Sequence, residues 1–186
     1  VTSTVEGNYY GVAGNGTNRT DLTYGGTVIN VYDGANITHT CETDGVGIFQ
    51  SQLGITNIYG GTIRGLVGVQ VSAGTINISG GNIIATPDNN YTYTSSGNIV
   101  DGAALSIVNR SGGYAGYINV NIAGGNFHSE NGDAVLEYTA NANCEKVDSI
   151  SITGGTFNGA NSDINVQLKD SSVAEPVVDG GTFTGR

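Results

Sequence analysis

One short unit recurs through most of this 186-residue chain and constrains its fold more than any other feature. Its fullest copy, from Ser149 to Asn158, reads Ser-Ile-Ser-Ile-Thr-Gly-Gly-Thr-Phe-Asn. The copies share alternating apolar residues, a Gly-Gly pair, a Thr or Asn, and then an Ile or Phe. The Gly-Gly pairs occupy 60–61, 80–81, 124–125, 154–155 and 180–181, and the shortest interval between first glycines is 20 residues. Repeats of this period are typical of solenoids, in which each repeat buries its apolar face against its neighbours.

The alternation before each Gly-Gly pair predicts a short strand with one buried face. Glycine tolerates a positive φ and lets two backbones approach closely, so each pair predicts a corner after that strand. A second apolar segment precedes each copy, and the Ile or Phe after the corner starts a third strand. We therefore predict an all-β fold, a parallel β-helix of about six rungs with three short strands per rung.

Stacking of the rungs predicts ladders of equivalent residues. Two ladders are expected to face the core: Ile58, Ile78, Ile122, Ile152 and Val178, and Ile63, Ile83, Phe127, Phe157 and Phe183. A row beside the corner is expected to contain Thr62, Asn82, Asn126, Thr156 and Thr182. On the segments that precede each copy, alternation predicts an exposed row of Phe49, Gln70, Ser106, Glu137 and Gln167.

The repeat resembles the right-handed parallel β-helix of the pectin lyase-like superfamily. It is also similar to the Gly-Gly-Thr-Phe repeat regions of surface and secreted proteins of bacteria. The resemblance covers residues 27–186 and implies a right-handed β-helix in an extracellular protein, but its motif carries no chemistry. Residues 1–26 lack the repeat and are expected to form an N-terminal cap or edge segment, and a loop insertion is expected around 86–102. We expect a single structural domain that belongs to a larger multidomain chain.

Charge and composition exclude several classes of partner. The formal net charge is −10 with only six Lys and Arg residues, which argues against nucleic acid and anionic membranes, since both require a basic face. No apolar run is long enough to insert into a membrane. Cys41 and Cys144 are expected to lie several rungs apart as free thiols, because a disulfide requires close Cα atoms. No metal site or cofactor is predicted, although an acidic rod leaves calcium binding open.

Tyrosines provide the candidate binding residues. Tyr32 and Tyr59 occupy matching positions on neighbouring rungs, where two rings can form a platform for an apolar sugar face. The second candidate patch is expected on the loops of the long interval between Gly80 and Gly124, because loops on a rigid scaffold often carry recognition. That patch consists of Tyr91, Tyr93, Arg110, Tyr114 and Tyr117.

Catalysis needs clustered carboxylates, as the polysaccharide lyases and hydrolases of the superfamily have. The nearest candidates are Glu130, Asp133 and Glu137, which lie largely in predicted turns. We therefore favour a non-catalytic extracellular module on a bacterial surface, which binds a glycan or a host cell-surface protein. A polysaccharide lyase or glycoside hydrolase and a passive spacer are the alternatives.

Overall fold

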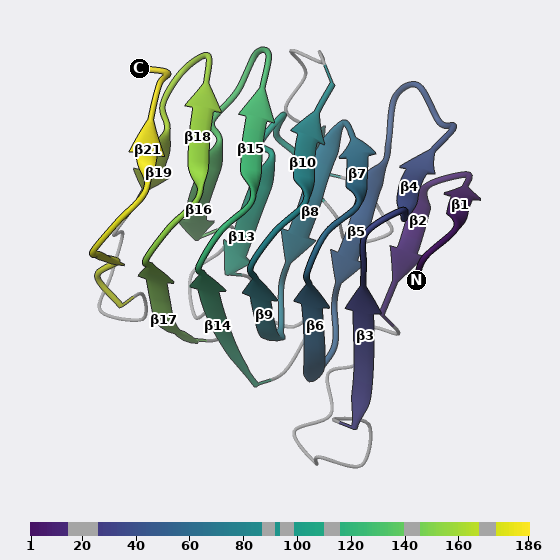
Figure 1. Cartoon of the computed structure of the whole chain (residues 1–186), viewed down its shortest axis with the longest axis horizontal. Coiled ribbons are helices and arrows are strands. Elements are labelled where there is room, and N and C mark those ends of the chain that lie inside the picture. Colours follow the sequence, from purple (N-terminus) through teal and green to yellow (C-terminus); the bar gives the residue numbers. More distant parts are fainter. Residues whose placement is uncertain (15–25, 87–91, 94–98, 110–115, 140–145, 168–173) are drawn as a thin grey trace.

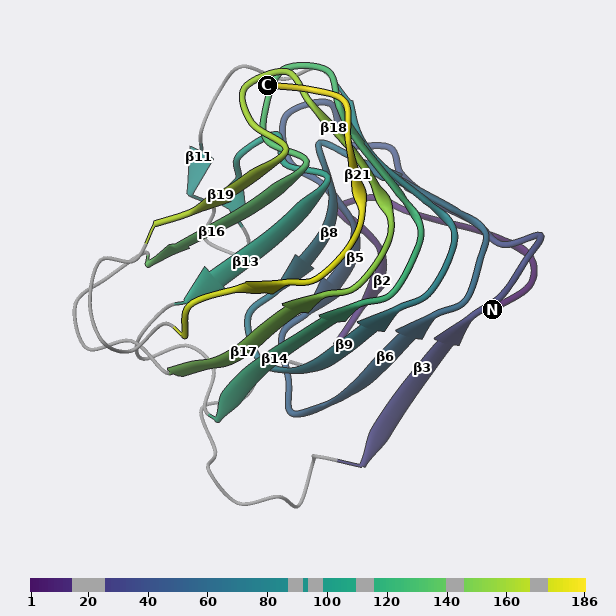
Figure 2. The ribbon, with the colours of Figure 1, turned by 60° about the vertical axis from the view of Figure 1, so that its left-hand side comes forward.

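Three parallel sheets wrap around one core in the computed structural model, which describes residues 1–14, 26–86, 92–93, 99–109, 116–139, 146–167 and 174–186 (Figure 1). In each turn the chain passes from the sheet that we name sheet C through sheet A to sheet B (Figure 2). The rungs stack in chain order, as the colours of Figure 1 show. The predicted fold, a parallel β-helix with three strands per rung and about six rungs, is confirmed.

The three sheets share the strands almost equally. Sheet A contains β1 (Thr4–Gly7), β4 (Asn36–His39), β7 (Thr62–Gly65), β10 (Asn82–Ala85), β15 (Asn126–Ser129), β18 (Thr156–Gly159) and β21 (Thr182–Phe183). Sheet B contains β2 (Tyr10–Ala13), β5 (Val46–Gln50), β8 (Val67–Val71), β13 (Leu105–Asn109), β16 (Val135–Thr139) and β19 (Ile164–Val166). Sheet C contains β3 (Thr27–Val31), β6 (Gly54–Ile58), β9 (Gly74–Ile78), β14 (Tyr117–Ile122), β17 (Lys146–Ile152) and β20 (Val177–Val178). A separate antiparallel pair joins β11 (Thr92–Tyr93) to β12 (Ile99–Val100).

Each Gly-Gly pair turns the chain from sheet C to sheet A, and its two glycines are required for different reasons. A Cβ on the first glycine would meet the backbone of the preceding rung, as at Gly80, where it would lie 2.3 Å from the carbonyl oxygen of Tyr59. The second glycine has a positive φ, for example +89° at Gly81, which residues with a Cβ rarely adopt. The corner therefore depends on close approach at one position and on backbone conformation at the next.

The core contains the predicted inward ladders together with inward residues of sheet B, and the last members of the ladders, Val178 and Phe183, are exposed. Register pairs Ile58 with Ile78, and the same ladder continues through Ile122 and Ile152 to Val178. In sheet A the second ladder ends in three stacked rings, with centroids 4.9 Å apart for Phe127 and Phe157 and 5.2 Å apart for Phe157 and Phe183. The residues beside the corner also pair as predicted: Thr62 with Asn82, Asn82 with Asn126, Asn126 with Thr156, and Thr156 with Thr182.

The predicted exposed row on sheet B is wrong. Phe49 packs in an apolar cluster with Tyr10, and Gln70 and Ser106 are fully buried. The residues that cover sheet B come from the expected insertion: Ile99 and Ala103 pack against outward side chains of β13 and β16. Gln70 holds this cover by donating to the carbonyl oxygen of Ile99 (2.7 Å) and accepting from its N–H (3.0 Å).

The predicted exposed position of Glu137 is wrong for a different reason. Register pairs Ser106 with Leu136, so Glu137 lies beside Ile107, a residue of the core. Glu137 is fully buried on the inner side of sheet B. Of the five predicted residues, only Gln167 is exposed.

The first strands, β1 and β2, come from the segment without repeats. They pair in parallel with β4 and β5 and form the edges of sheets A and B. Within the described residues, no helix is long and apolar enough to span a membrane.

Candidate functional site on the outer face of sheet C

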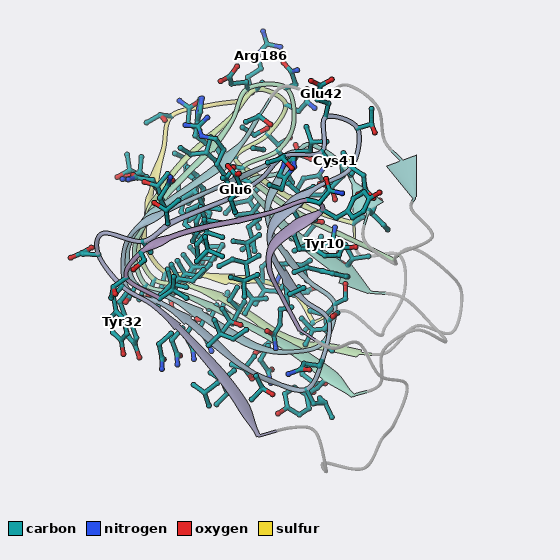
Figure 3. All side chains as sticks on the ribbon, turned by 90° about the vertical axis from the view of Figure 1, so that its right-hand side faces the viewer. Glu6, Tyr10, Tyr32, Cys41, Glu42 and Arg186 are labelled. Carbon is teal, nitrogen blue, oxygen red and sulfur yellow. The ribbon has the colours of Figure 1, made fainter. Side chains whose placement is uncertain are left out.

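The outer face of sheet C carries the one pair of predicted tyrosines that the structure shows in contact. Tyr32 and Tyr59 each follow the last residue of a sheet C strand, immediately outside the corner. Their rings are stacked, with centroids 5.2 Å apart and planes 17° apart. Both side chains remain exposed, by 44% and 49%. Figure 3 shows Tyr32 at the end of β3, outside the coil.

A ladder of asparagine side chains lies next to the tyrosine pair. Asn30, Asn57, Asn77 and Asn121 occupy equivalent positions on four successive rungs. The Nδ2 atom of each of the last three donates to Oδ1 of the preceding asparagine, over distances of 2.8–2.9 Å. Each side-chain amide has two N–H groups, and the ladder uses one of them. Asn57, Asn77 and Asn121 therefore each keep one N–H that the ladder does not use and that can serve a ligand.

A third row of outward side chains, next to the asparagine ladder, changes from apolar to polar along the rod. Val28 and Ile55 are exposed apolar residues, by 53% and 39%, and Thr75, Asn119 and Ser149 follow them on the next rungs. The polar end of the row is ordered by a hydrogen bond of 2.7 Å from Ser149 Oγ to Asn119 Oδ1. Near the tyrosines the face is therefore partly apolar, while farther along it is covered by small polar groups.

This face carries no charge over four of its strands. The sequences of β3, β6, β9 and β14 contain no Asp, Glu, Lys or Arg, although the chain has a net charge of −10. The tyrosines belong to a row that continues through Ser79, Ala123 and Thr153 to Asp179 on the last rung. Both ends of this row are acidic, because Asp33 follows Tyr32 and Asp179 is the last member. Over these four strands the outer face of sheet C is thus uncharged, while β17 carries Lys146 and Asp148.

Of the other predicted binding residues, the structure describes Tyr117 and the backbone of Tyr93. Tyr117 begins β14, and alternation with Asn119 places it on the same face, where it is half-buried. Tyr93 lies in β11, but its side chain is outside the described part of the chain. Tyr91, Arg110 and Tyr114 also lie outside the described residues, so the proposed loop patch has no geometry to report.

The three candidate catalytic acids do not converge. Glu130 is exposed, and Glu137 faces the core. Asp133 lies on the outer side of sheet B, where its Oδ2 accepts a hydrogen bond of 3.1 Å from Asn165. A sheet therefore separates Asp133 from Glu137, and the two carboxyl groups cannot act on one bond.

A carboxyl group that the sequence did not single out, that of Asp101, belongs to the segment that covers sheet B. Its oxygens accept hydrogen bonds from the Ala103 N–H (2.9 Å) and from Ser106 Oγ (2.5 Å). Burial of the carboxyl raises the pKa of Asp101 to about 6, and the charge of Asp133 adds to this rise. Burial also raises the pKa of Asp133. Nothing in the sequence around Asp101 distinguished it from an ordinary loop acid.

Among the described residues, no group of three or more His, Cys, Asp and Glu side chains is placed to hold a metal ion. Cys41 is a half-buried free thiol, and Cys144 lies outside the described residues. His39 Nε2 accepts the Leu66 N–H at 3.0 Å, and burial lowers the pKa of His39. The neutral imidazole of His39 therefore holds the turn between β7 and β8 through its bond to Leu66.

Comparisons of the chain with protein-family models, with curated proteins and with solved structures found no match.

Proposed function

We propose that this protein is a non-catalytic glycan-binding module of an extracellular bacterial surface protein, and that it binds through the outer face of sheet C. The observation that supports this most is the exposed, stacked pair of Tyr32 and Tyr59. A tyrosine ring is a rigid apolar surface with a hydroxyl at its tip, which suits the alternating apolar and polar faces of a sugar.

The asparagine ladder adds what the tyrosines lack. Its N–H groups and amide oxygens can exchange hydrogen bonds with sugar hydroxyls at the regular spacing of the rungs. Because the amides are already bonded to one another, little side-chain entropy is lost when a ligand binds. Preorganised polar groups beside an aromatic pair are a suitable arrangement for a neutral, hydroxyl-rich ligand.

The wider setting of the proposal comes from the repeat sequence. Its likeness to Gly-Gly-Thr-Phe regions and to the pectin lyase-like superfamily supports an extracellular location, within a larger multidomain chain, without a cofactor. A host cell-surface protein is the other partner that fits a surface module. Nucleic acid and membrane insertion do not fit a chain of this charge and hydropathy.

The alternatives predict different behaviour. A polysaccharide lyase or glycoside hydrolase would shorten a glycan, and the raised pKa values of Asp101 and Asp133 are the observation in its favour. Both carboxyl groups, however, accept hydrogen bonds, Asp101 from Ser106 and Asp133 from Asn165. A passive spacer would neither bind nor cleave.

The test is incubation with a panel of plant, mucin and microbial polysaccharides, with and without calcium. Retention in affinity gels and the length of the polysaccharide are both measured. Retention without shortening supports the binding module. Shortened chains would favour an enzyme, and the absence of both effects would favour a spacer or a protein-binding adhesin.

A further inference from the structure

The tyrosine ladder consists of two rungs, so the outer face of each ring has no aromatic neighbour, and that of Tyr59 is directed toward the following rungs. Tyr32 and Tyr59 stack on each other, so each uses one face of its ring. The next residues in the same row are Ser79 and Ala123, whose N–H groups bond to the preceding rung as that of Tyr59 does. Both are small and exposed. The second face of Tyr59 is therefore directed along the rod, over residues that cannot cover it.

The space beyond Tyr59 is bordered by polar groups on one side. Asn77 and Asn121 stand in the adjacent row, on the same two rungs as Ser79 and Ala123. Their amides are held by the ladder bonds of 2.8 and 2.9 Å. A sugar ring stacked on Tyr59 would thus lie beside fixed hydrogen-bonding groups, with its plane across the rod axis. Because glycosidic bonds leave a sugar near its ring plane, the rest of the polymer would extend across the rod.

Charge restricts the ligand that this space accepts. The strands beneath it, β9 and β14, carry no charged residue, and Asp33 and Asp179 lie at the two ends of the row. An anionic ligand would find no cation on these strands and would meet two carboxylates. On the next strand, β17, Lys146 is offset by Asp148, so that strand adds no net positive charge. An uncharged ligand needs no cation on these strands and would not be repelled by the two carboxylates.

From these observations we infer that the ligand is a neutral polysaccharide that crosses the rod along the strand direction, with one sugar stacked on the free face of Tyr59 above Ser79. This inference rests on the proposed function and adds the class and direction of the ligand. It excludes uronic-acid polymers as the main ligand. It also differs from a platform in which both tyrosines contact the sugar from outside and Ser79 plays no part.

Substitutions at Ser79 separate the two arrangements. Ser79→Tyr extends the aromatic ladder into the proposed sugar position, whereas Ser79→Ala keeps the space open, and both retain the Tyr32–Tyr59 pair. Each variant, together with Tyr59→Ala, is run in affinity gels that contain mannan, xylan, hydroxyethyl cellulose or polygalacturonate. Unfolding in denaturant confirms that each variant is folded.

We expect retention by at least one neutral polymer, little or none by polygalacturonate, unchanged retention of Ser79→Ala, and an affinity at least about tenfold lower for Ser79→Tyr and Tyr59→Ala. If Tyr59→Ala loses binding while Ser79→Tyr keeps or improves it, the proposed function survives and the direction of the ligand is wrong. Preferred retention by polygalacturonate would overturn the neutral ligand. If Tyr59→Ala binds as the unmodified protein does, or if nothing is retained, both the inference and this binding face fail.

Discussion

The ring of Tyr59 lies nearly parallel to that of Tyr32, with 5.2 Å between centroids, on the outside of the corner that joins sheets C and A. On the inside of sheet A, Phe127 and Phe157 stack in the same manner at 4.9 Å. Stacked rungs bring equivalent residues into contact on both sides of the wall, because neighbouring strands are separated by about 4.8 Å. The same geometry therefore builds the core and arranges the exposed rings.

The stacked phenylalanines differ in burial, and this predicts different effects on stability. Phe157 is fully buried between two rings, while Phe183 is 46% exposed. Phe157→Ala should lower the free energy of unfolding by about 3–5 kcal/mol, because it leaves a cavity in the core. Phe183→Ala should cost about half of this or less. Denaturant unfolding of both variants is the measurement, and equal costs would contradict the interior ladder.

The first glycine of a corner should not tolerate a methyl group. Gly80→Ala would place a Cβ 2.3 Å from the Tyr59 carbonyl oxygen, so one backbone must shift. We expect a loss of about 1–3 kcal/mol in the free energy of unfolding. Gly26→Ala is the matched control, since its Cβ would meet nothing within 4 Å. Similar stabilities for the two variants would show that the rungs do not approach so closely at this corner.

Gln70 should hold the cover of sheet B in place. Gln70→Ala removes both hydrogen bonds to Ile99 and leaves its buried N–H and carbonyl oxygen without that partner. Buried polar groups without partners are costly, so stability should fall by about 2–3 kcal/mol. The Ile99 amide should also exchange its hydrogen faster than amides of the core ladders. Gln167→Ala, at the exposed residue that follows β19, is the control, and an unchanged exchange rate at Ile99 in the Gln70→Ala variant would contradict this role.

Asp101 should make the protein more stable in mild acid. Its pKa is raised from 3.8 to about 6 by burial, so the folded protein binds a proton that the unfolded chain has lost between these values. The free energy of unfolding should therefore fall as the pH rises from 3.8 to about 6, and this group adds no further change above that range. The upper bound of the effect is about 3 kcal/mol.

The isosteric variant Asp101→Asn separates this effect from the general repulsion of a chain with a net charge of −10. It should weaken the dependence of stability on pH, while a variant of the exposed Glu130, Glu130→Gln, should keep it. Unfolding curves collected across the range provide the measurement. Identical pH profiles for Asp101→Asn and the unmodified protein would show that folding does not raise the pKa of Asp101.

Much of the fold could be predicted because the repeat fixes its own register. The Gly-Gly pair sets the position of every residue around it, so the partners of Ile58 and Ile63 and the contact of Tyr32 with Tyr59 followed from counting along the copies. The asparagine ladder could have been found in the same way, since Asn30, Asn57 and Asn77 hold equivalent positions.

Sheet B could not be predicted as well, for two physical reasons. Its strands lie far from the Gly-Gly pairs, and a slip of one residue reverses the face, as it did for Glu137, which lies beside Ile107 instead of Ser106. Its outer face is covered by a segment from a unique insertion, which the repeat does not describe, so Gln70 is buried despite its polar side chain.

The most direct test of the proposed binding face is the dissociation constant of a polysaccharide that the affinity gels retain, measured for the unmodified protein, Tyr32→Ala and Tyr59→Ala. Both tyrosines are exposed, so their removal should change stability by no more than about 1 kcal/mol. If the polysaccharide binds at the outer face of sheet C, Tyr59→Ala should raise the dissociation constant at least about tenfold, and Tyr32→Ala should raise it less. An unchanged dissociation constant for a folded Tyr59→Ala variant would contradict binding at this face.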